Sequence, residues 1–258
     1  MRTLLIIGIG AGDPEQVTAQ AAAALNRVDV FFVIDKGQAT RELVDLRTEI
    51  CDRYIAGSGY RIVEIPDVQR DRTGPEYRRA VSDWHAERAA RCAETIAGEL
   101  ADGGTGGFLV WGDPAIYDST IRIVENICGR SGLDCDYRVI PGISSVQQLA
   151  AAHRIVLNGI GEPIVITTGR RLQQSIADGA QNIVVMLDAD LACRSLLGSA
   201  IGWQIFWGAY LGTADETLVA GPLADVIDEI GRVRSALRER KGWIMDTYLL
   251  RRINSQPG

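Results

Sequence analysis

The chain has 258 residues, of which 47% are hydrophobic and 23% charged, a composition typical of one large or two modest globular domains. Its net charge of −6 argues against an extended nucleic-acid-binding surface, and no apolar run reaches the ~20 residues that span a membrane. Five cysteines without a Cys-x-x-Cys pair and only two histidines argue against a disulfide framework and a metal site, and favour a reducing, cytoplasmic location.

The first half of the chain alternates between predicted strands and helices. Residues 3–8 form a continuous apolar run, which predicts a strand buried on both faces rather than a secretory signal. Further strands are expected over 28–34, 61–65, 107–111 and 136–140, and helices over 16–25, 41–55, 75–100 and after Pro114. This alternation predicts an α/β domain with a parallel sheet.

The pattern changes near residue 142. Pro141 and Gly142 break the chain, and Ser144 or Ser145 can cap a new helix. The strand-like ranges beyond this point are 163–169, 182–188, 203–212, 216–221 and 241–250. Because fewer helices separate these strands, we expect a second α/β domain with a mixed sheet over 142–258, after an N-terminal domain over 1–141.

A glycine-rich loop follows the first strand. Gly8, Gly10 and Gly12, with Asp35 at the end of the next strand, imitate the fingerprint of a dinucleotide-binding domain. That fingerprint requires glycine at position 13, where this chain has Asp13, and a carboxylate at the helix start would repel a pyrophosphate. A nicotinamide-dependent oxidoreductase is therefore kept only as an alternative.

A second turn motif follows the strand expected at 107–111. Gly112 lets the chain turn, Asp113 can cap a helix, and Pro114 suits the first helical position. Apolar residues recur at helical spacing from 116 to 127, and Gly129 can end the helix. Taken alone, the motif predicts a strand, a tight turn and a helix.

Four motifs in chain order resemble the tetrapyrrole methyltransferases of corrin and siroheme synthesis. They are the glycine loop 8–13, the turn 112–114, the segment 141–145 and Met186 at the end of a predicted strand. The resemblance covers the whole chain. It implies the two-domain tetrapyrrole methylase fold, in which the methyl donor S-adenosylmethionine lies in a cleft between the domains and leaves as S-adenosylhomocysteine.

The resemblance also implies which residues bind this cofactor. They are Ala11, Trp111, Gly112, Asp113, Ile116, Tyr117, Ser144, Ser145, Met186, Tyr210 and Gly212. Many relatives have proline where this chain has Ala11 and glycine where it has Trp111. Because Trp111 is bulky, its expected contact is through the main chain.

Three stretches are similar to one corrin-methylating type of enzyme within the family. They are residues 70–89, 110–120 and 206–216. The similarity implies methylation at C1 of precorrin-5 with water-driven loss of the C20 acetyl group as acetate. It also implies a precorrin tetrapyrrole as the partner and a homodimer. Methylation of another corrin carbon and a non-catalytic small-molecule binding protein remain as alternatives.

Four residues are candidates for the reaction itself. Asp35 ends a strand at the edge of a parallel sheet where α/β folds bind ligands, so it is the expected general base. Lys36 can hold Asp35 ionised or stabilise charge that develops on the acetyl oxygen. Arg170 and Arg171 follow a predicted strand and are expected to bind carboxylates of the substrate.

Overall fold

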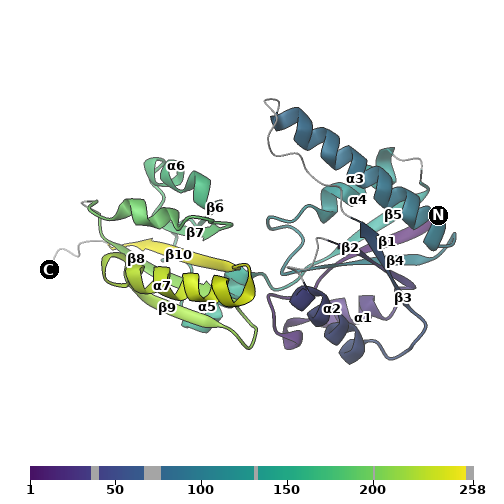
Figure 1. The fold of residues 1–258 in the computed structure, drawn as a ribbon, viewed down its shortest axis with the longest axis horizontal. Helices are drawn as coiled ribbons and strands as arrows, with labels where there is room; N and C mark the ends of the chain where they lie inside the picture. The colour runs from purple at the N-terminus through teal and green to yellow at the C-terminus, as the bar shows by residue number, and fades with distance from the viewer. Residues whose placement is uncertain (36–40, 67–76, 131–132, 200, 254–258) are drawn as a thin grey trace. The chain divides into compact units, whose positions relative to one another are not determined.

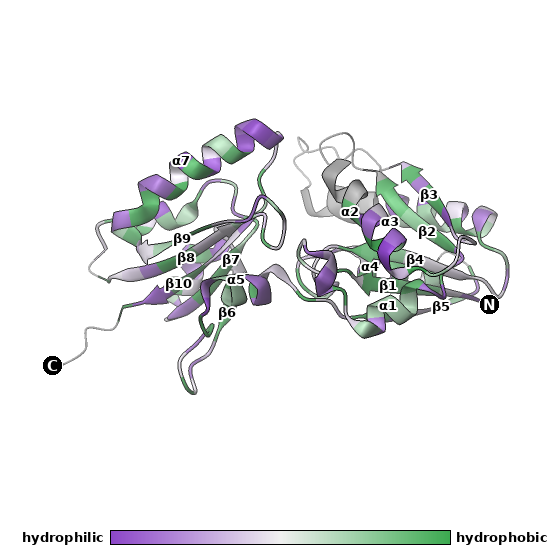
Figure 2. Ribbon diagram, turned by 90° about the horizontal axis from the view of Figure 1, so that it is seen from below, coloured by the Kyte–Doolittle hydropathy of each residue, from purple (hydrophilic) through white to green (hydrophobic). Residues whose placement is uncertain are grey.

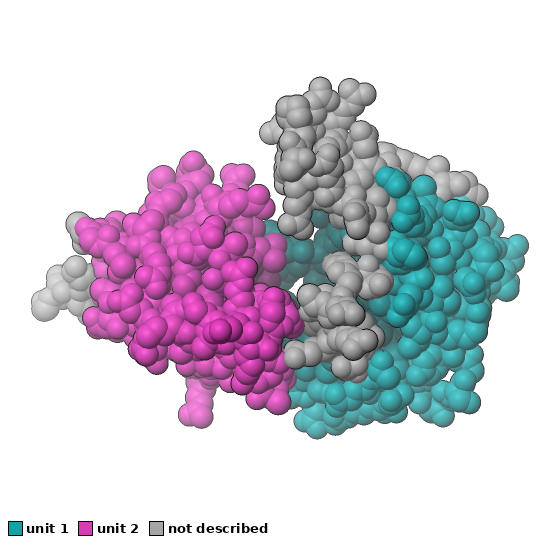
Figure 3. All heavy atoms as spheres, viewed as in Figure 1, with its two compact units in different colours: residues 1–144 teal, residues 145–258 magenta. Residues whose placement is uncertain are grey.

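The chain contains two compact units in the structure, which is a computed structural model that describes residues 1–35, 41–66, 77–130, 133–199 and 201–253. Figure 3 colours the units, which comprise Met1–Ser144 and Ser145–Gly258. The first contains a parallel sheet and the second a mixed sheet, which confirms the predicted fold class. No helix among the described residues is long and apolar enough to cross a membrane.

The sheet of the N-terminal unit has the strand order β3-β2-β4-β1-β5. Its strands are β1 (Arg2–Gly8), β2 (Val30–Asp35), β3 (Arg61–Pro66), β4 (Thr105–Val110) and β5 (Cys135–Ile140). β1 is buried from Leu4 onward and lies between β4 and β5. The apolar run at the N-terminus is therefore a buried strand, as predicted.

Helices cover both faces of this sheet (Figure 1). They are α1 (Ala19–Leu25), α2 (Arg41–Tyr54), α3 (Tyr77–Glu99) and α4 (Thr120–Arg130). Leu5 and Ile7 of β1 pack in one core with α1 and α2, whereas Leu4 and Ile6 pack in the other with α3 and α4. Successive residues of a strand point to opposite faces, so a strand covered on both sides must be apolar throughout (Figure 2).

The connections from β1 and β4 leave the sheet on opposite faces. β1 leads to α1, and its neighbour β4 leads to α4 on the other side. The loops that follow the two strands therefore separate at their carboxyl ends. In open α/β sheets this is the topological switch point at which ligands bind.

The sheet of the C-terminal unit has the strand order β6-β7-β10-β8-β9. The strands are β6 (Val165–Thr168), β7 (Asn182–Met186), β8 (Trp203–Ala209), β9 (Thr217–Pro222) and β10 (Asp246–Arg252). β6 and β7 pair in parallel and the other pairs are antiparallel. The helices are α5 (Ser145–His153), α6 (Leu172–Ala177) and α7 (Leu223–Lys241).

Helix α7 was not expected from the sequence. The helix buries Leu223, Ile227, Ile230 and Leu237 at helical spacing, but the same face also carries the buried Arg234. An arginine within an apolar stripe weakens the helical pattern. The strand predicted over 241–250 consequently begins later, at Asp246.

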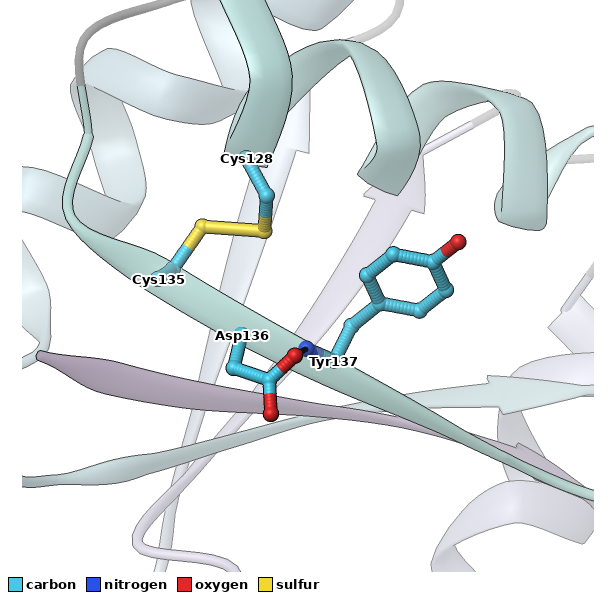
Figure 4. Close-up of a disulfide and its surroundings, with 4 residues drawn as sticks. All are labelled: Cys128, Cys135, Asp136 and Tyr137. Carbon is cyan, nitrogen blue, oxygen red and sulfur yellow. Dashed lines mark hydrogen bonds between the residues drawn. A yellow bond between two sulfur atoms is a disulfide. The ribbon is translucent and has the colours of Figure 1, made fainter.

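One disulfide joins neighbouring elements of the N-terminal unit. Cys128 of α4 is bonded to Cys135 of β5 (Figure 4). Tyr137, two residues further along β5, donates a hydrogen bond to Glu125 of α4. The cysteine pattern did not predict this pair, because the number and spacing of cysteines do not reveal which elements are adjacent. Three other cysteines are free and buried: Cys51, Cys92 and Cys193.

Candidate active site

Three strand ends of the N-terminal unit meet through glycine. A Cβ atom built on Gly142 would lie 2.1 Å from the carbonyl oxygen of Gly112, and one built on Gly8 would lie 2.6 Å from the Gly142 nitrogen. Real side chains do not tolerate such distances. The ends of β1, β4 and β5 can therefore lie this close only with glycine at these positions.

The loops that follow β1 and β4 are joined by main-chain hydrogen bonds. The Gly112 N–H donates to the Gly10 carbonyl at 2.7 Å, and the Gly10 N–H donates to the Gly112 carbonyl at 3.4 Å. Both glycines have positive φ, +90° at Gly10 and +67° at Gly112. The next residue, Ala11, is buried and donates its N–H to the Gln16 side-chain oxygen at 2.8 Å.

Asp113 ties the β4 loop to the end of β5. Its Oδ1 accepts the Ala115 N–H at 2.8 Å, and its Oδ2 accepts the Gly142 N–H at 2.9 Å. The prediction that Asp113 caps a helix starting at Pro114 is wrong. α4 begins only at Thr120, whose N–H donates to Asp118 at 2.6 Å.

The structure gives a physical reason for this late helix start. Tyr117 has a φ of +51°, which a right-handed helix cannot contain. Gly129, predicted to end the helix, lies inside α4 instead. Ile116 is half-buried beside the exposed Tyr117, so the turn presents both residues before the helix begins.

Two predicted cofactor contacts have unfavourable backbone conformations. The described non-glycine residues with positive φ are Tyr117, Arg154, Leu187, Leu191 and Tyr210. Two of them are predicted contacts, and Leu187 directly follows a third, Met186. Strained backbone concentrates at ligand sites. Leu187 is also 66% exposed.

Two predicted contacts follow the end of β8. Tyr210 is 2% exposed, and its hydroxyl donates to the Trp243 carbonyl at 2.6 Å. Its main-chain N–H donates to the Met245 carbonyl and its own carbonyl accepts the Thr213 N–H. Gly212 has a φ of +77° and donates its N–H to Glu216 at 2.7 Å.

A buried polar network holds the loop that follows Met186. Asp188 accepts the Tyr248 hydroxyl at 2.6 Å, and its carbonyl accepts from the Arg234 guanidinium at 2.6 Å. Arg234 also pairs with Asp246 at 2.9 Å. Burial raises the pKa of Asp246, and the charge of Arg234 opposes that shift. This network was not predicted from the sequence, because its members come from distant segments.

The remaining predicted residues occupy varied environments. Ser144 is buried, and Ser145 begins α5. Trp111 is half-buried directly after β4. Arg170 and Arg171 are exposed on the short turn that follows β6.

The two proposed catalytic residues are only partly described. Asp35 ends β2, and its main chain pairs with Pro66 of β3. Its side chain and all of Lys36 lie outside the described residues. His153 is the last residue of α5 in the C-terminal unit, and its Nε2 lies 3.0 Å from the Trp207 carbonyl oxygen. In the described part of the chain, no group of three or more histidine, cysteine, aspartate or glutamate side chains could hold a metal ion.

Known proteins resemble this chain along its whole length. The family model described as Tetrapyrrole (Corrin/Porphyrin) Methylases matches residues 3–227. A precorrin-6A synthase [deacetylating] from Sinorhizobium sp is 48% identical over 252 residues, which cover 98% of this chain and 96% of the relative.

Solved structures show the same fold. A cobalamin synthesis related protein (CobF) from Corynebacterium diphtheriae is 40% identical with a TM-score of 0.85, covering 98% of this chain and 100% of the other. A uroporphyrin-III C-methyltransferase from Thermus thermophilus, complexed with S-adenosylhomocysteine, has a TM-score of 0.55 at 16% identity, covering 96% of this chain and 91% of the other. At that identity the second likeness concerns the fold alone.

Proposed function

The chain belongs to the tetrapyrrole (corrin/porphyrin) methylases, and from this premise we propose that it is an S-adenosylmethionine-dependent methyltransferase of cobalamin synthesis. Its proposed reaction is that of a deacetylating precorrin-6A synthase. C1 of precorrin-5 is methylated, and the C20 acetyl group leaves as acetate. The observation that carries the proposal is the 48% identity to an enzyme of that name over 98% of the chain.

The strand ends of the N-terminal unit fit the proposed cofactor. Gly8, Gly112 and Gly142 let three strand ends pack against one another at the switch point of the sheet, where α/β folds bind ligands. S-adenosylmethionine would supply an activated methyl group there, which suits a chain that contains only two histidines. We propose that the loop containing Gly112 and Asp113 orients the cofactor, with Ile116 and Tyr117 beside it.

Titration calorimetry separates this proposal from the alternatives. We expect the protein to bind S-adenosylhomocysteine and not NAD. Incubation with precorrin-5 and S-adenosylmethionine should then give one methylated product and one acetate per turnover. Methylation without acetate would favour a methylase acting on another ring carbon. Binding without turnover would favour a non-catalytic binding protein, and NAD binding alone would contradict the proposal.

Asp113→Ala should weaken cofactor binding beyond its effect on folding. The change removes the acceptor of the Gly142 N–H and so frees the β4 loop from the end of β5. We expect the free energy of unfolding to fall by about 1–3 kcal/mol, the usual effect of leaving a partly buried donor without its partner. S-adenosylhomocysteine affinity, measured by calorimetry on the folded fraction, should fall as well. Unchanged affinity in a folded variant would reduce Asp113 to a purely structural residue.

The exposed arginines after β6 should matter for the substrate. We propose that Arg170 and Arg171 bind carboxylates of the precorrin, and each change to alanine should raise KM for precorrin-5 by about threefold to tenfold. Arg238→Ala, on the exposed surface of α7, is the matched control. If all three variants have the KM of the wild type, Arg170 and Arg171 are solvent-exposed side chains without a role in substrate binding.

A further inference from the structure

Two neighbouring strands of the N-terminal unit separate toward their carboxyl ends. β2 pairs with β4 only at its first two residues, Val30 and Phe31, which face Gly106 and Gly107. The glycines allow this close approach, because a Cβ on either would lie within 3.0 Å of neighbouring side chains. At Phe108, the next residue, β4 again carries a bulky side chain and the pairing stops. The gap therefore lies at the edge of the sheet where α/β folds bind ligands.

The gap contains a cavity of about 140 Å³. A water molecule occupies ~30 Å³ in the liquid, so the cavity has room for a group of several heavy atoms. Apolar side chains of β2 and β4 form part of its wall. The polar lining comes from Arg47, Arg88, Trp111, Asp118, Ser119 and Thr120.

Two arginines reach this cavity from opposite faces of the sheet. Arg47 belongs to α2 and Arg88 to α3, and Arg88 is only 4% exposed. Burial lowers the pKa of Arg47, and the charge of Asp118 opposes that shift. A guanidinium group carries hydrogen-bond donors only, and its planar fork matches a carboxylate.

The indole of Trp111 adds a donor to the same cavity. Its Nε1 is buried and has no hydrogen-bond acceptor among the described residues. Buried donors are almost always satisfied, by protein or by a bound molecule. Among the described residues of the lining, the one acidic side chain is that of Asp118, which already accepts the Thr120 N–H through Oδ1. The lining is therefore rich in donors and calls for a ligand that supplies acceptors.

We propose that this cavity binds a carboxylate. Guanidinium groups and an indole N–H provide charge-assisted and neutral hydrogen bonds to such a group within a small volume. The source of the carboxylate rests on the proposed function, in which it is either the acetate released from the substrate or an acidic side chain of the precorrin. Ile34 lines the cavity and directly precedes Asp35. The cavity therefore lies beside the strand end that carries the expected general base.

Acetate binding to the whole protein tests the proposal without any methyl transfer. The readout is saturation-transfer NMR with acetate as the probe. Trp111→Phe keeps an aromatic side chain and the main chain but removes the N–H with its five-membered ring, and Arg88→Met removes the charge but keeps a long stem. Arg91→Met, on the exposed side of the same helix, is the matched control. We expect affinity to fall about threefold to tenfold in Trp111→Phe and about tenfold or more in Arg88→Met, with no change in Arg91→Met.

The Trp111→Phe variant keeps the test decisive if Arg88→Met fails to fold. KM for precorrin-5 then identifies the source of the carboxylate. An unchanged KM with weakened acetate binding assigns the cavity to the released acetate, and a raised KM assigns it to a side chain of the substrate. Wild-type protein that binds no acetate, or acetate affinity that is equal in wild type and Trp111→Phe, would overturn the proposal. Failure of the S-adenosylhomocysteine titration would instead count against the proposed function.

Discussion

Gly142→Ala should disrupt both the N-terminal unit and its cofactor site. The new Cβ would lie 2.1 Å from the Gly112 carbonyl oxygen, and it cannot move away because both groups belong to the main chain. Overpacking of a core with flexible side chains already costs about 1–3 kcal/mol. We expect the free energy of unfolding to fall by at least that much, and S-adenosylhomocysteine affinity to fall by about tenfold or more because three strand ends must separate.

Gly57→Ala is the control for Gly142→Ala. A Cβ at Gly57 would meet no atom within 4 Å, so its effect on stability should stay within about 0.5 kcal/mol. Thermal unfolding and calorimetry of both variants give the comparison. A Gly142→Ala protein that unfolds and binds like the wild type would show that the strand ends do not meet as described.

Much of the fold can be predicted from local patterns. Strands buried on both faces, such as β1 and β7, are continuous apolar runs, and their burial depends on little else. The late start of α4 could not be predicted, because the local preference of Asp113 for a helix cap competes with its long-range hydrogen bond to Gly142. α7 was missed because Arg234 occupies its buried face to meet partners elsewhere in the unit.

Some residues of the candidate site belong to short sequence motifs, whereas others come together only in the folded unit. The loops after β1, β4 and β5 carry short glycine motifs that can be recognised in the sequence, although the contacts between these glycines are long-range. The cavity between β2 and β4 combines Arg47, Arg88 and Trp111 from three separate elements. None of these residues belongs to a motif with the others, so only their packing in the folded unit brings them together.

The side chain at position 35 should carry the chemistry. Addition of a methyl group to the ring and attack of water on the acetyl carbonyl both need a proton acceptor or a group that orients water. Asp35 ends β2 at the ligand-binding edge of the sheet, directly after a residue that lines the proposed carboxylate cavity. His153 is the weaker candidate, because its Nε2 lies 3.0 Å from the Trp207 carbonyl oxygen and its ring packs against Phe206 with centroids 5.6 Å apart.

Asp35→Asn, which is nearly isosteric, should lower kcat with precorrin-5 by about 100-fold or more while S-adenosylhomocysteine affinity stays intact. Asp52→Asn, at an exposed position of α2, controls for the loss of one charge and should leave kcat unchanged. Lys36→Met should lower kcat less, because it removes a charge that assists Asp35 and not the acceptor itself. Methylated corrin and acetate are measured separately in each variant. If methylation survives and acetate is lost, Asp35 serves only the hydrolysis, and the two steps are separable. If both products form at the wild-type rate, another group accepts the proton.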